Sequence, residues 1–66
     1  MSREQFLQHY ITVFDGKGAI KACGREATKR LIEAADQLEP GIRHGNAETG
    51  VMDVGRIQAL ARKLGA

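Results

Sequence analysis

Apolar side chains between residues 19 and 38 recur at helical spacing. At about 100° per residue they fall within a stripe about 80° wide, and they are Ile20, Cys23, Ala27, Leu31, Ala34 and Leu38. Lys21, Arg25 and Lys29 follow one another four residues apart on the opposite side. The pattern predicts one amphipathic helix over residues 19–38, unbroken at Gly24, that buries small residues on one side and presents basic residues on the other.

The first fourteen residues predict a shorter helix that carries every aromatic residue of the chain. Ser2 and Gln5 have the spacing of a capping box, so this helix should begin after Ser2 and extend to about Phe14. Its aromatic side chains share one face and should contribute heavily to the core. We expect a core formed by Phe6, Tyr10, Phe14, Leu31, Leu38, Ile57 and Leu64.

Two glycine-containing segments separate the helices. Residues 15–18 supply the backbone freedom that a tight reversal needs after the first helix. Pro40 and Gly41 end the second helix, because the residue before a proline avoids helical angles. Residues 41–52 are glycine-rich and lack a clear period, which predicts an ordered loop with at most a short turn of helix. A loop of this length is uncommon in so small a domain and marks a candidate functional segment.

The last helix is predicted from Val54 to about Leu64. Asp53 is a favourable N-cap, two basic residues occupy the final turn, where the helix dipole favours cations, and Gly65 is a plausible stop. The sequence therefore predicts an all-α fold. It is a single small three-helix domain spanning residues 1–66, with a long central helix and a glycine-rich loop before the last helix.

Size and charge narrow the classes of partner. A chain of 66 residues with 42% hydrophobic and 27% charged residues is typical of one globular domain. A domain this small buries a limited share of its surface and is only marginally stable, so a homodimer is compatible with its size. The net charge of +2 permits contact with nucleic acid or an acidic protein surface and requires neither. The single cysteine, Cys23, fits a small buried hydrophobe in a reducing, cytoplasmic setting. We expect neither a membrane span nor a secretory signal.

The motifs that could support catalysis are weak. Arg43, His44 and Gly45 match the R-H-G of the histidine phosphatase family. That motif follows a buried strand in a far larger α/β domain, so we interpret the match as chance. Zinc sites need three or four ligands, usually in closely spaced pairs, and His9, Cys23 and His44 do not provide them. The sequence predicts no enzyme activity, no metal site and no cofactor.

Residues 19–32 resemble the helix, glycine turn and recognition helix of helix-turn-helix DNA-binding proteins, such as phage repressors and small terminase subunits. The resemblance implies that the N-terminal helix supports the motif and that Gly24 forms the turn. The side chains that it places on the recognition helix are Thr28, Lys29 and Ile32. This chain departs from the pattern at Arg25, usually apolar, and at Glu26, usually a Ser or Thr cap. The function implied is a dimeric DNA-binding transcriptional regulator.

The function that we favour is a small non-catalytic binding protein. It docks on a larger protein or protein–nucleic acid complex and modulates or inhibits it, as anti-CRISPR-like and host-takeover proteins of phages and mobile elements do. That setting is an analogy from small size and the lack of a catalytic constellation. Ile32 is expected to be exposed within a polar rim, which is the make-up of an interface. The expected partner-binding residues are Lys21, Arg25, Thr28, Lys29, Ile32, Arg43 and His44.

Overall fold

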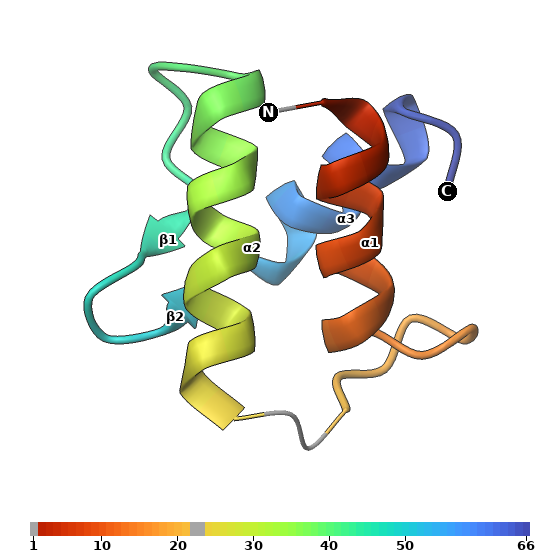
Figure 1. The fold of residues 1–66 in the computed structure, drawn as a ribbon, viewed down its shortest axis with the longest axis horizontal. Coiled ribbons are helices and arrows are strands. Elements are labelled where there is room, and N and C mark those ends of the chain that lie inside the picture. The colour runs from red at the N-terminus through yellow and green to blue at the C-terminus, as the bar shows by residue number, and fades with distance from the viewer. Residues whose placement is uncertain (1, 22–23) are drawn as a thin grey trace.

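The computed structural model describes residues 2–21 and 24–66, which form three helices and a two-stranded antiparallel sheet. The elements in chain order are α1 (Arg3–Val13), α2 (Gly24–Leu38), β1 (Gly45–Asn46), β2 (Val51–Met52) and α3 (Val54–Lys63). Figure 1 shows α1 and α2 side by side, α3 crossing behind them, and the hairpin on the side of α2 away from α1. The three predicted helices are therefore confirmed, but the fold is not purely all-α because residues 45–52 form a β-hairpin.

The N-terminal helix is capped as the sequence predicts. The Ser2 hydroxyl accepts a hydrogen bond from the Gln5 backbone N–H at 3.2 Å, and the Gln5 side chain accepts one from the Ser2 N–H at 3.1 Å. This reciprocal capping box satisfies two backbone donors that the first helical turn leaves free. The rings of Phe6, Tyr10 and Phe14 stack in sequence along the helix, with centroids 6.4 and 4.8 Å apart. The capped helix thus presents one continuous aromatic face.

The central helix is shorter than predicted. It begins at Gly24, whose φ of +81° is left-handed and lies outside the helical region. Residues 19–21 are not helical, and Ile20 forms an isolated antiparallel bridge with Phe14. The predicted helix over residues 19–38 is therefore wrong at residues 19–21. As a result Ile20, expected inside, is 55% exposed.

From Gly24 onward, the predicted apolar stripe is confirmed. Leu31 and Ala34 are fully buried, and Ala27 and Leu38 are half-buried against the core. Cys23, which the sequence placed on the same stripe, lies outside the described residues. The stripe therefore identifies the inner face of α2 correctly, although it does not locate the first residue of the helix.

Side chains from all three helices form the core. The cluster of buried apolar residues consists of Phe6, Val13, Phe14, Leu31, Ala34, Ala35, Ile57, Leu60 and Ala61. The half-buried apolar residues that pack against this cluster are Leu7, Tyr10, Ala27, Leu38, Met52, Val54 and Leu64. Every residue of the predicted core is in one of these two sets. The aromatic face of α1 and the small residues of α2 thus meet as the hydrophobic pattern predicts.

A second face of α2 is also covered. Ile32 is fully buried, yet it lies outside the core cluster. Both strands of the hairpin contact α2 on the side away from α1 (Figure 1). The expectation that Ile32 is exposed is wrong because residues 45–52 fold back onto α2. Helical periodicity assigns a residue to a face, but it does not show which distant segment covers that face.

The last helix begins and ends as predicted. The Asp53 carboxylate accepts a hydrogen bond from the Arg56 backbone N–H at 3.1 Å, which confirms the N-cap. At the other end Gly65 has a φ of +104°, and the Ala66 N–H donates to the Ala61 carbonyl at 2.8 Å. A left-handed glycine with this long-range hydrogen bond is typical of a Schellman-type helix end. The caps therefore fix where the chain enters and leaves α3.

Candidate functional site

The hairpin between α2 and α3 is ordered by its own hydrogen bonds. The register pairs Gly45 with Met52 and Asn46 with Val51. Within the turn, the Asn46 carbonyl accepts from the Gly50 N–H at 3.0 Å, and the Asn46 side chain accepts from the Glu48 N–H at 2.9 Å. Gly45 has a φ of +136°, and a Cβ built there would lie 2.5 Å from the Met52 Cα. Only glycine fits this close approach of the two strands.

The same hairpin is closed at its base and lies against α2 at its tip. At its base, the Asp53 N–H donates to the His44 carbonyl at 2.7 Å, just before α3 begins. At its tip, Gly50 lies against the first turn of α2, where a Cβ would come within 2.6 Å of the Arg25 Cγ. The hairpin is therefore held at its base and at its tip, and it presents a preformed outer surface.

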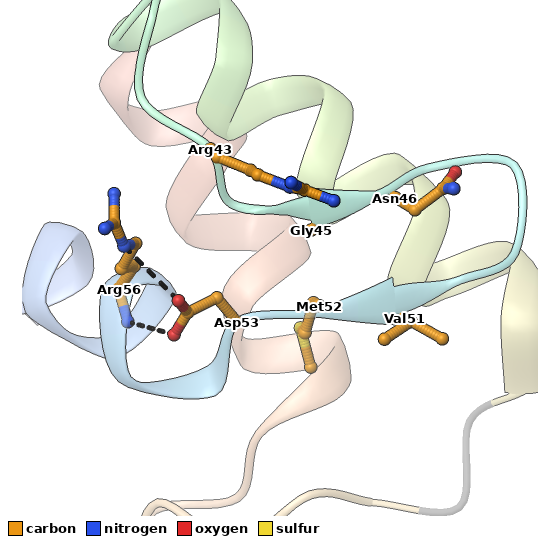
Figure 2. A pocket seen from close by; sticks show the side chains of 7 residues that line it. All are labelled: Arg43, Gly45, Asn46, Val51, Met52, Asp53 and Arg56. Carbon is orange, nitrogen blue, oxygen red and sulfur yellow. Dashed lines mark hydrogen bonds and ion pairs between the residues drawn. The ribbon is translucent and has the colours of Figure 1, made fainter.

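A shallow hollow of about 350 Å³ opens on this outer surface. We call it the hairpin hollow, and it is lined by Arg43, Gly45, Asn46, Val51, Met52, Asp53 and Arg56. Figure 2 shows Arg43 extending along β1 and Arg56 projecting from the first turn of α3. Val51 is 67% exposed, the highest value among the exposed large apolar side chains of the described residues. The hollow thus combines an apolar side chain with two guanidinium groups.

Of the two guanidinium groups in the hairpin hollow, one has an anionic partner and the other has none among the described residues. The Arg56 Nε lies 3.3 Å from the Asp53 Oδ2, so this guanidinium already has an anionic partner. Arg43 is exposed and forms no ion pair or hydrogen bond with any described residue. A guanidinium offers five N–H donors in a planar fork that matches carboxylate and phosphate groups. Arg43 is therefore available to an external anion beside the exposed Val51.

Lys21 and Arg25, predicted on one helical face, lie on different parts of the molecule. Lys21 precedes α2, and its Nζ donates to the Ile11 carbonyl at 2.7 Å near the end of α1. Arg25 is exposed in the first turn of α2, and its side chain lies against Gly50 of the hairpin. The predicted row of Lys21, Arg25 and Lys29 is therefore not formed, because α2 starts only at Gly24.

Thr28 and Lys29 form their polar contacts within α2. The Thr28 hydroxyl donates to the Gly24 carbonyl at 3.2 Å. The Lys29 Nζ lies 4.0 Å from the Glu26 carboxylate, at the limit of an ion pair. Exposed pairs of this kind contribute little to stability. Both residues are half-buried, and neither lines the hairpin hollow.

His44 is buried, with 1% of its surface exposed. Neither ring nitrogen has a hydrogen-bond partner among the described residues. A neutral imidazole carries one donor and one acceptor, so its burial without partners costs free energy. The imidazole of the R-H-G tripeptide is thus closed off from solvent in this conformation. The described part of the chain contains no group of three or more His, Cys, Asp or Glu residues that could hold a metal ion.

Val51 and Arg56 were not among the predicted site residues. Both residues reach the hollow only because residues 45–52 form a hairpin, and the sequence predicted this segment as a loop. The signal that could have found it is the pair Asn46 and Gly50, since turn residues of this kind often separate the strands of a hairpin. Once the register is known, the alternation of side chains across the strands places Val51 on the outside.

Comparisons with known proteins gave no match: no family model, no curated protein and no solved structure resembles this chain closely enough to be assigned. Within the described residues, none of the helices is both long enough and apolar enough to span a bilayer.

Proposed function

We propose that this protein is a small non-catalytic binding protein that docks on a larger macromolecular partner through the hairpin hollow and modulates that partner. The observation that carries the proposal is the position of Val51, an exposed apolar side chain, beside the unpaired guanidinium of Arg43. Burying apolar surface contributes about 25 cal/mol per Å². Interfaces commonly surround such an apolar centre with polar groups, and arginine is enriched among residues that dominate binding energy.

The order of the hairpin supports this function. A binding loop that must become ordered loses conformational entropy on association, which weakens affinity. Here the turn hydrogen bonds of Asn46, the close strand approach at Gly45 and the contact of Gly50 with Arg25 hold the loop in place beforehand. The long segment between α2 and α3 therefore has the preorganisation expected of a docking element.

The charge of the surface indicates what the partner presents. Arg25 at the hairpin tip and Arg43 at its base form no ion pair with described residues. A partner with carboxylates around an apolar patch would satisfy both features of the surface. We further propose that the protein regulates or inhibits its partner, as small proteins encoded by phages and mobile elements do. The small size of the chain supports this by analogy.

Affinity capture with matched variants tests the proposal. Tagged wild-type protein, Val51→Asp, Arg43→Glu and the control Arg30→Glu are immobilised and exposed to cell lysate with and without nuclease. Arg30 is an exposed arginine of α2 that lines none of the hollows described here. We expect the same protein to be retained by wild type and Arg30→Glu in both arms and to be lost with the two hairpin variants. Thermal melts followed by circular dichroism confirm that each variant is folded.

Two results would contradict this function. Full retention by both folded hairpin variants would show that the hairpin hollow does not bind the partner. Loss of capture after nuclease treatment would instead favour nucleic acid as the target. In that case affinity should fall by about one power of salt concentration for each phosphate neutralised, as expected of the DNA-binding alternative.

A further inference from the structure

Residues 15–19, which follow α1, form a compact, hydrogen-bonded turn. The Asp15 carboxylate accepts from the backbone N–H groups of Lys17 at 2.8 Å and Ala19 at 3.0 Å. These hydrogen bonds, above all the one from Ala19, hold the pKa of Asp15 below its ordinary value of 3.8. The Asp15 carboxylate is thus stabilised chiefly by the backbone of its own loop, with a smaller contribution from the charge of Lys21.

This turn is also fixed to α3. The Gln58 side-chain amide donates to the Gly18 carbonyl at 2.9 Å, across 40 residues of sequence. On the other side of the loop, Ile20 is bridged to Phe14, and the Lys21 N–H donates to the Val13 carbonyl at 2.7 Å. The loop therefore has a defined shape relative to α1 and α3.

Between this loop, α1 and the C-terminal end of α3 lies a hollow of about 660 Å³, which we call the loop hollow. Its side walls include Tyr10, Ile11 and Phe14 of the α1 region and Arg62 of α3. None of its lining residues belongs to the hairpin hollow. It is a separate surface of the molecule, independent of the one proposed to bind a partner at the hairpin.

Positive charge dominates the loop hollow. Lys17, Lys21 and Arg62 line it, and none of the three forms an ion pair with a described residue. The Lys21 Nζ donates one hydrogen bond to the Ile11 carbonyl, which leaves two of its donors available. Asp15 is the one acidic side chain in the lining, and its carboxylate already accepts two backbone hydrogen bonds. Among the side chains of the lining, three cations therefore outnumber one carboxylate, which interacts with Lys21.

Apolar groups accompany this charge. Ile11 lines the hollow and is 54% exposed. Ile20 is not part of the lining, but it is 55% exposed and its backbone is bridged to that of the lining residue Phe14. The stacked rings of Tyr10 and Phe14 also contribute to the lining. Ile11 and Ile20 are two of the four large apolar side chains that the described residues expose. Their burial would supply affinity that the charges alone, screened by salt, do not.

We infer that the loop hollow is a docking site for an acidic segment of a partner protein, one that carries carboxylates together with a large apolar side chain. The carboxylates face Lys17, Lys21 and Arg62, and the apolar side chain packs against Ile11 and Ile20. A protein segment fits better than nucleic acid because the most exposed apolar groups are aliphatic, whereas bases stack on exposed aromatic rings. Three cations gathered at one hollow also match a short acidic segment better than an extended phosphate backbone.

Selection from a random twelve-residue peptide display library tests this inference. The library is selected on immobilised wild-type protein and depleted on a Lys17→Glu/Arg62→Glu double variant. We expect the enriched peptides to carry an excess of Asp and Glu and at least one large apolar residue. The most enriched peptide is then synthesised with a fluorescein label, and its affinity is measured by fluorescence anisotropy.

Matched variants locate the binding site of that peptide. The double reversal should weaken binding by at least about tenfold, because it places like charges opposite the peptide. Ile11→Ser should weaken binding, whereas Val51→Ser, an equivalent change at the exposed valine of the hairpin hollow, should leave it unchanged. The double variant Lys17→Gln/Arg62→Gln removes the two charges without introducing repulsion. It replaces the double reversal in the binding measurement if the double reversal does not fold. Amide chemical shifts should change at residues 10–21 and 58–62.

Several outcomes would overturn the inference. They are failure to enrich any peptide, enrichment without an acidic excess, and affinity that the charge variants leave unchanged. A labelled 20-nucleotide DNA that binds more tightly than the selected peptide and competes with it would show that the occupant is nucleic acid. A failure here leaves the hairpin proposal standing, since the Val51 and Arg43 variants test that surface separately.

Discussion

Gly24 shows how one backbone angle at the residue scale decides where a helix begins. Its φ of +81° is left-handed, and a Cβ at this position would meet no atom within 4 Å. Replacing Gly24 with alanine therefore adds no clash but forces a left-handed alanine, which costs about 1–2 kcal/mol. We expect Gly24→Ala to lower the free energy of unfolding by about this amount, measured by urea denaturation. A continuous helix would have predicted a neutral or stabilising effect.

Gly16 provides the matched control for this substitution. A Cβ there also has nothing within 4 Å, and its φ lies outside the left-handed region. We expect Gly16→Ala to change the unfolding free energy by less than about 0.5 kcal/mol. If Gly24→Ala proved as harmless as Gly16→Ala, the left-handed start of α2 would be wrong.

For single residues, the sequence predicted the helix caps, but it did not predict which apolar side chains are covered by segments far away in the chain. The caps formed by Ser2 and Asp53 involve partners three residues away, so their spacing in the sequence is sufficient to predict them. Ile20 and Ile32 were both misplaced. Ile20 is exposed because its segment is not helical, and Ile32 is buried because the hairpin covers it. The cover of a side chain depends on segments far away in the chain.

At the scale of elements, the α1–α2 connection should respond to acid. Because the pKa of Asp15 is lowered in the folded state, its carboxylate contributes stability above about pH 3.8, and this contribution is lost as the pH falls through the folded-state pKa. Asp15→Asn should therefore lower the melting temperature at pH 6, and the difference from wild type should shrink at pH 2.5. Thermal melts at the two pH values measure this effect.

Asp36 on α2 is a suitable control for the pH experiment. It is exposed, and its side chain makes no hydrogen bond or ion pair with the described residues. Asp36→Asn should leave the pH dependence of the melting temperature close to that of wild type. An equal difference between Asp15→Asn and wild type at both pH values would contradict the role assigned to the Asp15 carboxylate.

The elements differ in how well the sequence predicts them. The helices are long enough for their apolar period to be recognised, and their ends carry local caps. The strands of the hairpin have two residues each, which is too short for alternation to be visible. They pair because glycines permit the turn and because α2 supports one face. The candidate site at the hairpin was therefore predicted as a segment but not as a geometry.

At the scale of the whole molecule, stability depends on a small shared core. Leu31 is fully buried in the cluster that joins the helices. Truncating a buried leucine to alanine costs about 2–5 kcal/mol, a large part of the stability of a domain this small. We expect Leu31→Ala to lose its cooperative melt or to melt far below wild type, as followed by circular dichroism. Glu33→Ala, exposed on the same helix, should melt near wild type.

In the folded molecule, basic residues that were predicted to share one helical face lie on different surfaces. The predicted binding face depended on a helix that continued through Gly24, so it joined Lys21 to Arg25 and Lys29. In the structure Lys21 lines the loop hollow, and Arg25 lies against the hairpin. Arg43 is the one predicted binding residue that lines the hairpin hollow. The predicted helices thus agree with the structure more closely than the predicted row of Lys21, Arg25 and Lys29, because that row depended on where α2 begins.

The buried imidazole of His44 also has a consequence for motion. An unpartnered polar group gains hydrogen bonds to water when it is uncovered, so its burial lowers the free energy needed to open the segment that carries it. The hairpin should therefore open transiently while the helices stay folded. Amide hydrogens of residues 45–52 should exchange with deuterium faster than those in the middle of α2, and His44→Leu should slow this exchange. Equal protection of hairpin and helix amides would mean that the molecule opens only as a single unit.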